Sequence, residues 1–375
     1  MPTASCRLEP SSSKRSLSPT RAAASSGEPS HAYLFHGPAG TGKRTVARAF
    51  AAELLAEGAP DPDEVRTRVM HGTHPDLTWV RPTGAHVMRV DDIEAPVVAA
   101  ANHTPFEARR RVFVLERVDT MNDEVANRLL KTLEEPASYV HLILLTEALG
   151  RVLETVVSRC QLVRFEPLPA ARIAAALEAD GVAAEVAAAC AGLSLGNAER
   201  ARLLASPAGA ELRAEVDAFA SAALDGEPGE TWRPLLERAE ARRAEAEEAV
   251  VVAGAERLEL EPKGRERKAI ERELEEAAKR DGRRARTEVL DLALTLTGLA
   301  FRDLVCLAEE APETVLARDR APALAERARG RDPRRLREAA ERCEDVRNAL
   351  ELNVSEDLAL SALGLRLAAL AGSPG

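Results

Sequence analysis

The sequence lacks the features that a membrane or secreted protein needs. No apolar run approaches the ~18 residues that a membrane-spanning helix requires, which argues against an integral membrane protein. The basic residues near the amino terminus are followed by no apolar stretch, so they do not form a secretory signal. We therefore expect a cytoplasmic protein.

Cysteine is also scarce, with five residues in a chain of 375. The five form neither a CxxC pair nor a Cys/His cluster at zinc spacing: Cys6, Cys160, Cys190, Cys306 and Cys343. Neither a disulfide nor a structural metal is expected from this spacing. The net charge of −10 also argues against a stand-alone nucleic-acid binder, which would be basic, so any role on DNA would be shared with partners.

Aromatic residues make up only 3% of the chain, whereas Ala, Leu, Glu and Arg are abundant. This composition favours helices over β-sandwiches and barrels, whose strands are rich in aromatic and β-branched residues. The length is enough for two or three domains. A mainly helical or α/β protein is predicted.

The first part of the chain has the pattern of an α/β domain. Three short apolar strings resemble buried parallel strands, at residues 32–35, 112–115 and 141–145. Helical stretches at residues 45–57 and 125–133 alternate with these strings, as in a doubly wound sheet. Residues 156–165 read as a loop that leads into a further strand.

From about Ala170 the strand signals disappear and the rest of the chain is predicted to be all-α. Helix breakers divide this part at Gly181, Gly196, Pro207 and Gly226. Residues 237–286 are almost continuously charged with alternating signs, which predicts a long solvated helix or helical hairpin with internal i,i+4 pairs. The apolar stretches 290–307 and 350–370 are each expected to be one helix in the core of the last domain.

The clearest motif lies directly after the first strand string and opens a helix. It spells GPAGTGK, and its residues predicted to hold phosphate are Gly37, Gly40, Thr41, Gly42 and Lys43. Glycines let backbone N–H groups converge on an anion, the helix dipole adds to the field, and the lysine supplies a point charge. The strand-to-helix setting predicts a P-loop nucleotide site.

The motif departs from a catalytic P-loop at several positions. It ordinarily closes with Ser or Thr, whose hydroxyl binds Mg²⁺, but Arg44 stands there. Thr45 is turned away by about 100° on a helix and is not expected to replace it. Glu116 keeps a carboxylate at the metal position, whereas Arg117 occupies the general-base position and cannot accept a proton. With Thr146 ending the third string, these residues predict a degenerate site that binds ATP weakly or not at all and does not hydrolyse it.

Four further strings occur in a recognisable order after HAYLFHGPAGTGK. They are HPD at 74–76, RVDDI at 89–93, NRLLKTLEEP at 127–136 and SRC at 158–160. Together they resemble the clamp-loader branch of the AAA+ ATPases, and within it the delta-prime subunits of bacterial DNA polymerase III. The resemblance runs from about residue 31 to 206 and more weakly beyond, whereas residues 1–20 do not resemble the family's start.

The resemblance implies an α/β fold followed by an all-α part. It implies a RecA-like AAA+ P-loop module at residues 31–167, a small helical lid at 168–206 and a helical collar at 207–375, with the charged insertion at about 237–286. Residues 1–30, rich in Ser, Pro, Ala and Arg, are predicted to be disordered.

The resemblance also implies a function and a set of partners. It implies a subunit that helps a ring convert ATP into placement of the sliding clamp on primed DNA during replication. The implied partners are ATPase subunits of the gamma/tau type, a delta-type subunit, the sliding clamp and, through the complex, primed DNA.

In this family the arginine of SRC is an arginine finger that reaches the nucleotide of a neighbouring subunit. The resemblance gives that role to Arg159, flanked by Ser158 and Cys160. Such a guanidinium stabilises charge on the transferring phosphoryl group. Glu199 stands where ATPase subunits carry a sensor arginine and would repel a γ-phosphate, with Arg200 as a partial compensation.

The family commonly carries a four-cysteine zinc knuckle before the HPD string, and this chain departs from it. Residues 51–76 contain no cysteine, and His71 and His74 alone are too few ligands. We expect no bound zinc and interpret both histidines as ordinary loop residues.

Two alternatives stay open at this stage. A catalytic, ATP-hydrolysing clamp-loader subunit would show Thr after the P-loop lysine and Asp-Glu after the second strand string, where this chain has Arg44 and Glu116-Arg117. A self-contained AAA+ remodeller of proteins would be expected to form a homohexamer.

Overall fold

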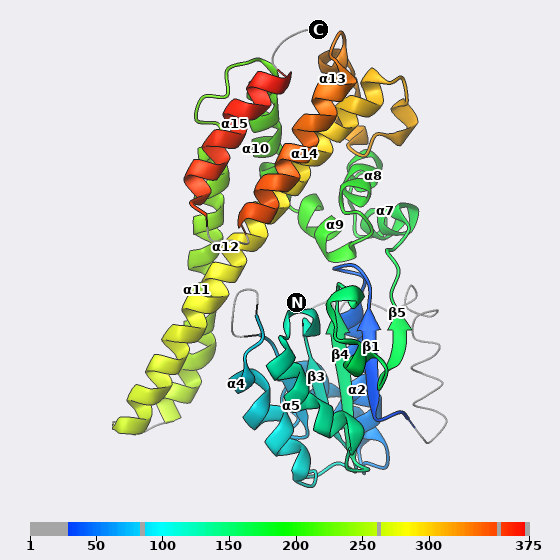
Figure 1. Ribbon diagram of the computed structural model, residues 1–375, viewed down its shortest axis with the longest axis vertical. Coiled ribbons are helices and arrows are strands. Elements are labelled where there is room, and N and C mark those ends of the chain that lie inside the picture. Colours follow the sequence, from blue (N-terminus) through cyan, green and yellow to red (C-terminus); the bar gives the residue numbers. More distant parts are fainter. Residues whose placement is uncertain (1–28, 83–86, 261–263, 351–353, 372–375) are drawn as a thin grey trace, which may run out of the picture. The chain divides into compact units, whose positions relative to one another are not determined.

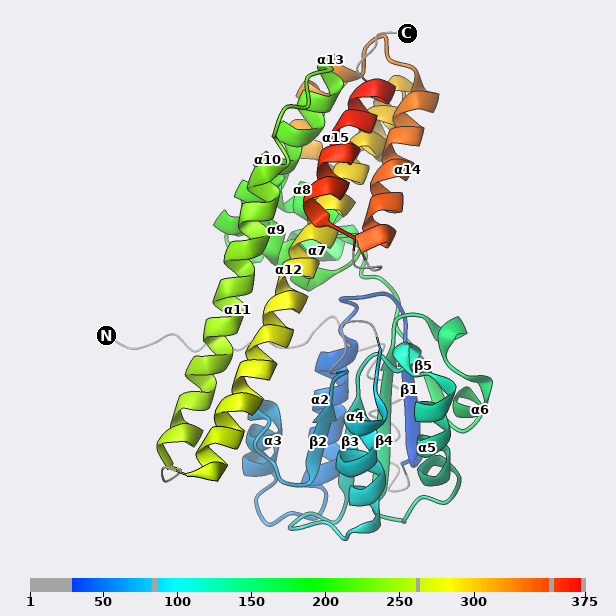
Figure 2. The same ribbon diagram turned by 60° about the vertical axis from the view of Figure 1, so that its left-hand side comes forward.

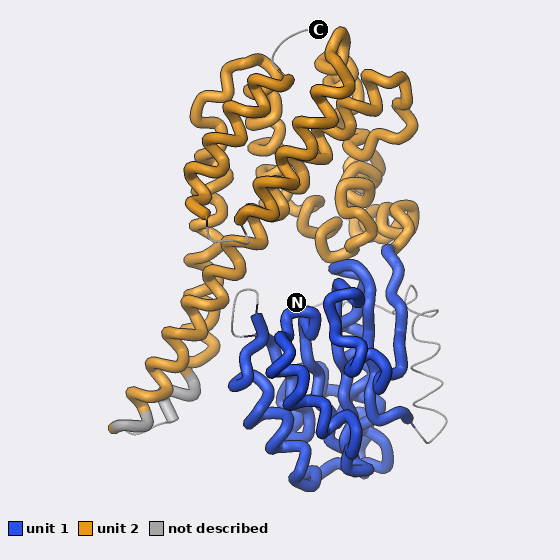
Figure 3. The backbone as a smooth tube through the Cα atoms, viewed as in Figure 1, with its two compact units in different colours: residues 1–167 blue, residues 168–375 orange. Residues whose placement is uncertain are grey.

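The computed structural model describes residues 29–82, 87–260, 264–350 and 354–371. The chain divides into two compact units, residues 1–167 and 168–375 (Figure 3). The predicted disorder of residues 1–30 falls almost entirely outside the described residues. The further division of the second unit into a lid and a collar stays a prediction.

Unit 1 is built on a parallel five-stranded sheet with the order β2-β3-β4-β1-β5 (Figure 2). Figure 1 shows the same sheet from another side. Its strands are β1 (Ala32–His36), β2 (Leu77–Val80), β3 (Arg111–Leu115), β4 (Val140–Thr146) and β5 (Gln161–Arg164). The three predicted strings are confirmed as β1, β3 and β4, the central strands, which are buried on both faces. The edge strand β2 was not predicted, because its half-buried residues form no apolar run.

Helices cover both faces of this sheet (Figure 2). Successive strand residues point to opposite faces, so in β1 Tyr33 and Phe35 pack with Phe50 of α2, whereas Leu34 packs in the cluster that holds Leu129 of α5. The helices of unit 1 are α2 (Lys43–Ala56), α3 (Pro62–His71), α4 (Val90–Ile93), α5 (Asp123–Glu134) and α6 (Glu154–Val157). Short helical turns are η1 (Glu94–Ala99), η2 (Ala100–Asn102), η3 (Val118–Thr120) and η4 (Leu149–Arg151).

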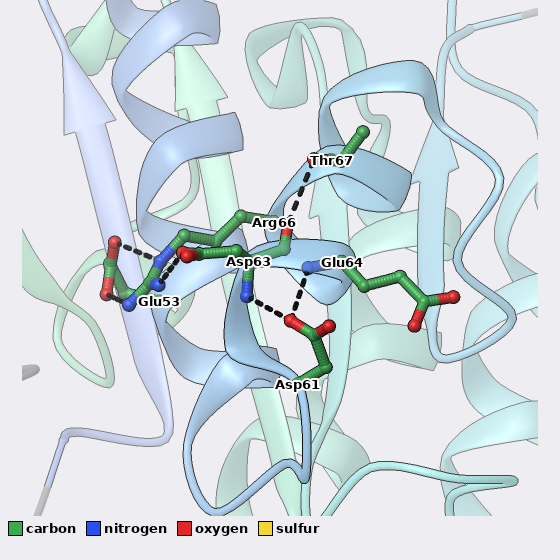
Figure 4. A network of polar contacts seen from close by, with 6 residues as sticks. All are labelled: Glu53, Asp61, Asp63, Glu64, Arg66 and Thr67. Carbon is green, nitrogen blue, oxygen red and sulfur yellow. Dashed lines mark hydrogen bonds and ion pairs between the residues drawn. The ribbon is translucent and has the colours of Figure 1, made fainter.

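A polar network fixes α3 against α2 (Figure 4). The Asp61 carboxylate caps α3 by accepting the backbone N–H groups of Asp63 and Glu64 at 3.1 and 3.0 Å. Arg66 then forms a two-point contact with Glu53 of α2, with both N–O distances 3.0 Å. This contact holds α3 against α2, the helix that the P-loop opens.

Unit 2 contains helices and no strand among its described residues, as the composition predicted. Its helices are α7 (Ala170–Ala179), α8 (Ala184–Leu193), α9 (Ala198–Ala205), α10 (Pro207–Leu224), α11 (Arg233–Leu260), α12 (Arg265–Ala308), α13 (Ala321–Ala328), α14 (Pro333–Leu350) and α15 (Glu356–Ala371). Two short turns are η5 (Pro312–Thr314) and η6 (Arg318–Arg320). The predicted breakers are confirmed: Gly181, Gly196 and Gly226 have φ values of 91°, 86° and 79°, and Pro207 opens α10.

The charged segment 237–286 forms a helical hairpin, in which α11 and α12 run side by side (Figures 1 and 2). A Cβ added to Gly282 of α12 would lie 2.5 Å from Glu247 of α11, so the helices approach closely there. The predicted i,i+4 ion pairs are present at Arg243–Glu247, Arg267–Glu271, Arg272–Glu276, Glu275–Lys279 and Arg284–Glu288.

The prediction of one helix over residues 350–370 is wrong, because α14 ends at Leu350 and α15 begins at Glu356. Ser355 followed by two acidic residues is a helix-start pattern, and it outweighs the apolar composition of the stretch. Its core role is confirmed, because Leu360 and Leu367 join Leu290 in one apolar cluster. No described helix combines the length and apolarity that crossing a membrane demands.

Candidate functional site

The P-loop occupies the connection between β1 and α2. Gly37, Gly40 and Gly42 have φ values of 142°, 69° and 88°, which favour glycine. Gly37 is further constrained, because a Cβ there would lie 2.1 Å from the carbonyl oxygen of Phe165 after β5. The predicted glycines are therefore the residues that this loop shape requires.

Lys43 folds back over the loop. Its Nζ donates to the carbonyl oxygens of Gly37 and Pro38 at 2.5 and 2.7 Å, and the Thr41 hydroxyl donates to Pro38 at 2.9 Å. Burial lowers the pKa of Lys43, while the nearby carboxylate of Glu147 opposes the shift. An anion entering the loop would have to draw the ammonium group away from these carbonyls.

Arg44 forms an ion pair with Glu116 across the site. The Nη2–Oε2 distance is 2.6 Å, and the Glu116 side chain is only 3% exposed. The other oxygen of Glu116 accepts hydrogen bonds from Trp79 Nε1 at 2.6 Å and Arg81 Nε at 3.1 Å. Three groups thus share the one carboxylate that a metal ion would need.

A P-loop fold implies Mg²⁺-bound nucleotide, and these residues do not fit the metal. The position of the hydroxyl ligand holds the guanidinium of Arg44, and that cation already neutralises Glu116. Thr45 is exposed on α2. The sequence did not predict the contacts of Trp79 and Arg81. Trp79 lies in β2 and Arg81 directly follows it, and the end of β2 lies beside the end of β3, after which Glu116 comes.

Arg117 adopts a left-handed conformation, with φ 55° and ψ 47°. Its carbonyl oxygen accepts from the backbone N–H and hydroxyl of Thr120 at 2.9 and 2.7 Å, so a tight turn follows β3. The turn brings Asp119 to Thr146 at the end of β4, whose hydroxyl donates to Asp119 at 2.8 Å. Asp119 was missed, although carboxyl ends of neighbouring parallel strands meet at one edge and could have indicated it.

Arg159 lies between α6 and β5. Its Nη1 donates to the carbonyl oxygen of Thr155 at 2.9 Å and to the Ser158 hydroxyl at 3.3 Å, and its Nη2 lies 2.6 Å from a carboxylate oxygen of Glu134. The two side chains are 35% and 47% exposed. Cys160 packs against the core, and burial raises the pKa of its thiol to about 12.

The predicted residues lie at two opposite edges of the sheet. The P-loop, Glu116 and Thr146 follow strands and form the carboxyl edge, whereas Arg159 precedes β5 and lies at the amino edge. From Gln161 to Phe165, which touches Gly37, four extended residues span roughly 13 Å. The structure therefore brings the nucleotide residues together and keeps Arg159 away from them.

Glu199 belongs to unit 2, where it is exposed in the first turn of α9. The helix is capped by Asn197, whose side chain accepts the Arg200 N–H at 2.9 Å. A carboxylate near the amino end of a helix is favoured by the helix dipole. Within its own unit, Glu199 is accounted for by this local effect.

The HPD string builds part of the amino edge. Asp76 accepts the backbone N–H groups of Phe106, Glu107 and Ala108 at 2.6, 2.9 and 2.9 Å. Burial opposes ionisation of Asp76, but these donors outweigh it and lower its pKa. His74 is buried beside Glu107 at 3.1 Å, and burial lowers its pKa. The interpretation as ordinary loop residues is thus too simple.

His71 and His74 differ in their surroundings. His71 is exposed and ends α3, whereas His74 is buried and accepts the backbone N–H of Asp76 at 3.2 Å. The described ranges contain no group of three or more His, Cys, Asp and Glu side chains placed to hold a metal ion.

Comparisons with known proteins agree with the motif pattern. Residues 13–169 match a family model described as "DNA polymerase III, delta subunit". The chain is 35% identical over 191 residues to DNA polymerase III subunit delta' of Bacillus subtilis, covering 50% of this chain and 57% of that protein. It is 40% identical over 154 residues to the subunit delta' of Pseudomonas aeruginosa, covering 40% and 46%.

The resemblance to delta-prime subunits is confirmed over residues 13–169. The parallel sheet with a P-loop after β1 is the fold that this resemblance implies. The chain spans about half the length of the curated relatives it matches. Among solved structures, a gamma subunit-related protein of Thermotoga maritima has a TM-score of 0.40 at 16% identity, covering 94% of this chain and 98% of that one.

Proposed function

Starting from the resemblance of residues 13–169 to delta-prime subunits, we propose that this chain is a clamp-loader subunit of a bacterial DNA polymerase III. In this role it joins gamma/tau-type and delta-type subunits in a ring that uses ATP to place a sliding clamp on primed DNA. The ring works in the cytoplasm, where the chromosome is replicated.

The chain contributes no hydrolysis of its own. The observation that carries this conclusion is the Arg44–Glu116 ion pair of 2.6 Å, which puts a fixed cation where the metal and its hydroxyl ligand belong. Arg117 follows directly, and its guanidinium cannot act as a general base. ATP binding at Lys43 is weak or absent and does not require Mg²⁺.

Arg159 acts on the nucleotide of a neighbouring subunit. Its position at the amino edge supports this role, because roughly 13 Å of extended strand separate that edge from the chain's own P-loop. A partly exposed guanidinium at that edge can reach another chain. It stabilises charge that builds up on the transferring phosphoryl group, using planar donors that a lysine lacks.

Reconstitution of the clamp loader tests the proposal. The gamma/tau-type and delta-type subunits of the same organism are mixed with the wild-type chain, with the Lys43→Ala variant or with no added chain. We expect clamp loading on primed DNA only when the chain is present, at the same rate for wild type and Lys43→Ala. ATPase is measured in parallel for the isolated chain, with and without Mg²⁺.

Two outcomes would contradict the proposal. Full clamp loading without the chain would remove it from the complex. ATPase by the isolated chain at ordinary enzyme rates of about 1 s⁻¹ or more, abolished by Lys43→Ala, would show a catalytic subunit instead.

A further inference from the structure

The structure joins two strings that are separate in the sequence. Glu134 is the last residue of α5 and belongs to the string NRLLKTLEEP, and Arg159 belongs to SRC before β5. Their side chains form an ion pair with an Nη2–Oε1 distance of 2.6 Å. Both ends rest on one scaffold, because Leu133 of α5 and Val156 of α6 are buried in the same apolar cluster.

A glutamate at this position is unfavourable for the helix that carries it. The carboxyl end of a helix bears partial negative charge, and α5 ends with Glu134 and then Glu135. Because the Glu134–Arg159 pair is also partly exposed, it adds little to folding. Stability therefore does not explain a carboxylate at residue 134.

The contacts of Arg159 fix the plane of its guanidinium. Nη1 is held by Thr155 and Ser158 from its own segment, and Nη2 faces Glu134 from a different helix. A guanidinium has five N–H donors, and in the described part of the chain Nε has no protein acceptor. Donors thus stay available for an incoming oxyanion while the group is held on two sides.

We propose that Glu134 is the positioning residue of Arg159, which orients the guanidinium toward the phosphate of a neighbouring chain. This inference rests on the proposed role of Arg159 in trans. With the carboxylate in place, the arginine enters the interface already oriented, so less conformational freedom is lost when it meets the phosphate. Without it, Arg159 keeps its charge but samples several rotamers.

The test compares Glu134→Gln with Glu135→Gln in the reconstituted clamp loader. Both variants remove one carboxylate from the same helix end, but only the first removes the partner of Arg159. For Glu134→Gln we expect about tenfold slower clamp loading, lower kcat for clamp- and DNA-stimulated ATP hydrolysis and an unchanged KM for ATP. Glu135→Gln keeps wild-type rates. The melting temperature of either isolated variant is equal to or slightly above that of the wild type.

A double variant separates this inference from the proposed function. In the Arg159→Ala background, Glu134→Gln is expected to have no further effect, because the group that it orients is gone. If Arg159→Ala itself loads clamps normally, the role in trans is lost. If Arg159→Ala is defective but Glu134→Gln is not, or is faster than wild type, only the positioning role is overturned. A lowered melting temperature for Glu134→Gln alone would make Glu134 a structural residue and overturn it as well.

Discussion

Each edge of the sheet in unit 1 holds an arginine paired with a glutamate, and the surroundings of the two pairs differ. At the carboxyl edge, Glu116 is buried and shared by Arg44, Arg81 and Trp79. At the amino edge, the Arg159–Glu134 pair is partly exposed to water. The same two residue types thus occur once inside a polar network and once at the surface.

This difference decides what each pair can do. The buried Glu116 carboxylate is costly to leave without donors and keeps three of them, although the Arg44 side chain itself is 49% exposed. An exposed pair is weak in water, and its arginine can exchange partners at little cost. Under the proposed function, the first arrangement would block chemistry at its own site, whereas the second would leave a guanidinium available to another molecule.

The largest expected effect comes from the exposed arginine. Under the proposed function, Arg159→Ala removes a guanidinium from the nucleotide site of the neighbouring subunit. Arginine fingers are worth about 10³ to 10⁵ in rate. We expect at least about a thousandfold slower hydrolysis at that site and a loss of coordinated clamp loading. The unfolding free energy of the isolated chain changes by less than about 0.5 kcal/mol.

The control for that experiment lies on the same segment. Arg164 of β5 is more exposed than Arg159 and lies at the other edge, beside His36 and 3.7 Å from Glu166. Arg164→Ala is expected to keep wild-type activity in the complex. Equal defects in both variants, or a failure of Arg159→Ala to assemble, would refute the assignment to Arg159.

The second effect concerns stability, for which the carboxyl edge is expected to matter more than the amino edge. Glu116→Ala leaves Trp79 without its acceptor, whereas Arg44 and Arg81 are 49% and 53% exposed and turn to water. We expect the unfolding free energy to fall by about 1 to 2 kcal/mol. Glu134→Ala breaks an exposed pair and costs less than about 1 kcal/mol. Urea unfolding of both variants measures the contrast. Similar losses would show that burial does not distinguish the pairs.

The third effect is the pH dependence of stability at the amino edge. Burial lowers the pKa of His74 below 6.5, so the unfolded chain takes up the proton first as the pH falls. The stabilisation is complete above pH 6.5 and declines as the pH falls toward the folded pKa, by at most about 1.4 kcal/mol per pH unit. We expect His74→Gln to flatten this slope between pH 7 and 5.

Two comparisons sharpen the pH experiment. His71→Gln, at the exposed end of α3, is expected to keep the wild-type slope. His141 has the same direction of shift, because it is buried at the start of β4, so a residual slope in His74→Gln is expected from it. A wild-type slope in His74→Gln would assign the whole acid sensitivity to other groups.

The smallest expected effect is the loss of stability when an exposed arginine–glutamate pair on α12 is broken. Arg284 and Glu288 are four residues apart with an N–O distance of 2.9 Å and are largely exposed. Glu288→Gln is expected to change the unfolding free energy by less than about 0.5 kcal/mol. A loss as large as that of Glu116→Ala would contradict the argument from burial.

The sequence predicted those parts of the fold that depend on local pattern. The central strands are continuous apolar runs, and the P-loop glycines follow one of them, so both could be located without coordinates. The strand β2 could not, because its four residues, three half-buried and one buried, carry no periodic signal. Trp79 and Arg81, which complete the contacts of Glu116, were missed together with it.

The two arginine–glutamate pairs show which contacts of the site could not be predicted from the sequence. The residue types at positions 44 and 117 lead to the prediction of a degenerate nucleotide site, which stays a prediction. The partners were not predictable, since the pairs Arg44–Glu116 and Glu134–Arg159 depend on how separate elements meet at an edge of the sheet. The charge of a residue shows that it can form an ion pair, but the sheet topology determines which residue is its partner.

The hairpin of α11 and α12 can be shortened without removing residues from the apolar cluster around Leu290. Residues 240, 247 and 254 of α11 are seven residues apart and lie against Arg286, Gly282 and Leu274 of α12, which are four and eight residues apart. Removal of residues 248–254 together with 273–279 takes one heptad from each leg and keeps the two contacts nearer the base. The arm becomes about 10 Å shorter at 1.5 Å per residue, while the apolar cluster around Leu290 is untouched.

Removal of residues 248–254 or of residues 273–279 alone shortens one helix of the hairpin and not the other. The contacts between the two helices on the far side of the deletion are then out of register. Circular dichroism is expected to show an unchanged melting temperature for the matched deletion and a lower one for each single deletion. An unchanged melting temperature for the matched deletion would show that the arm can be shortened by one heptad in each leg without loss of the domain that carries it.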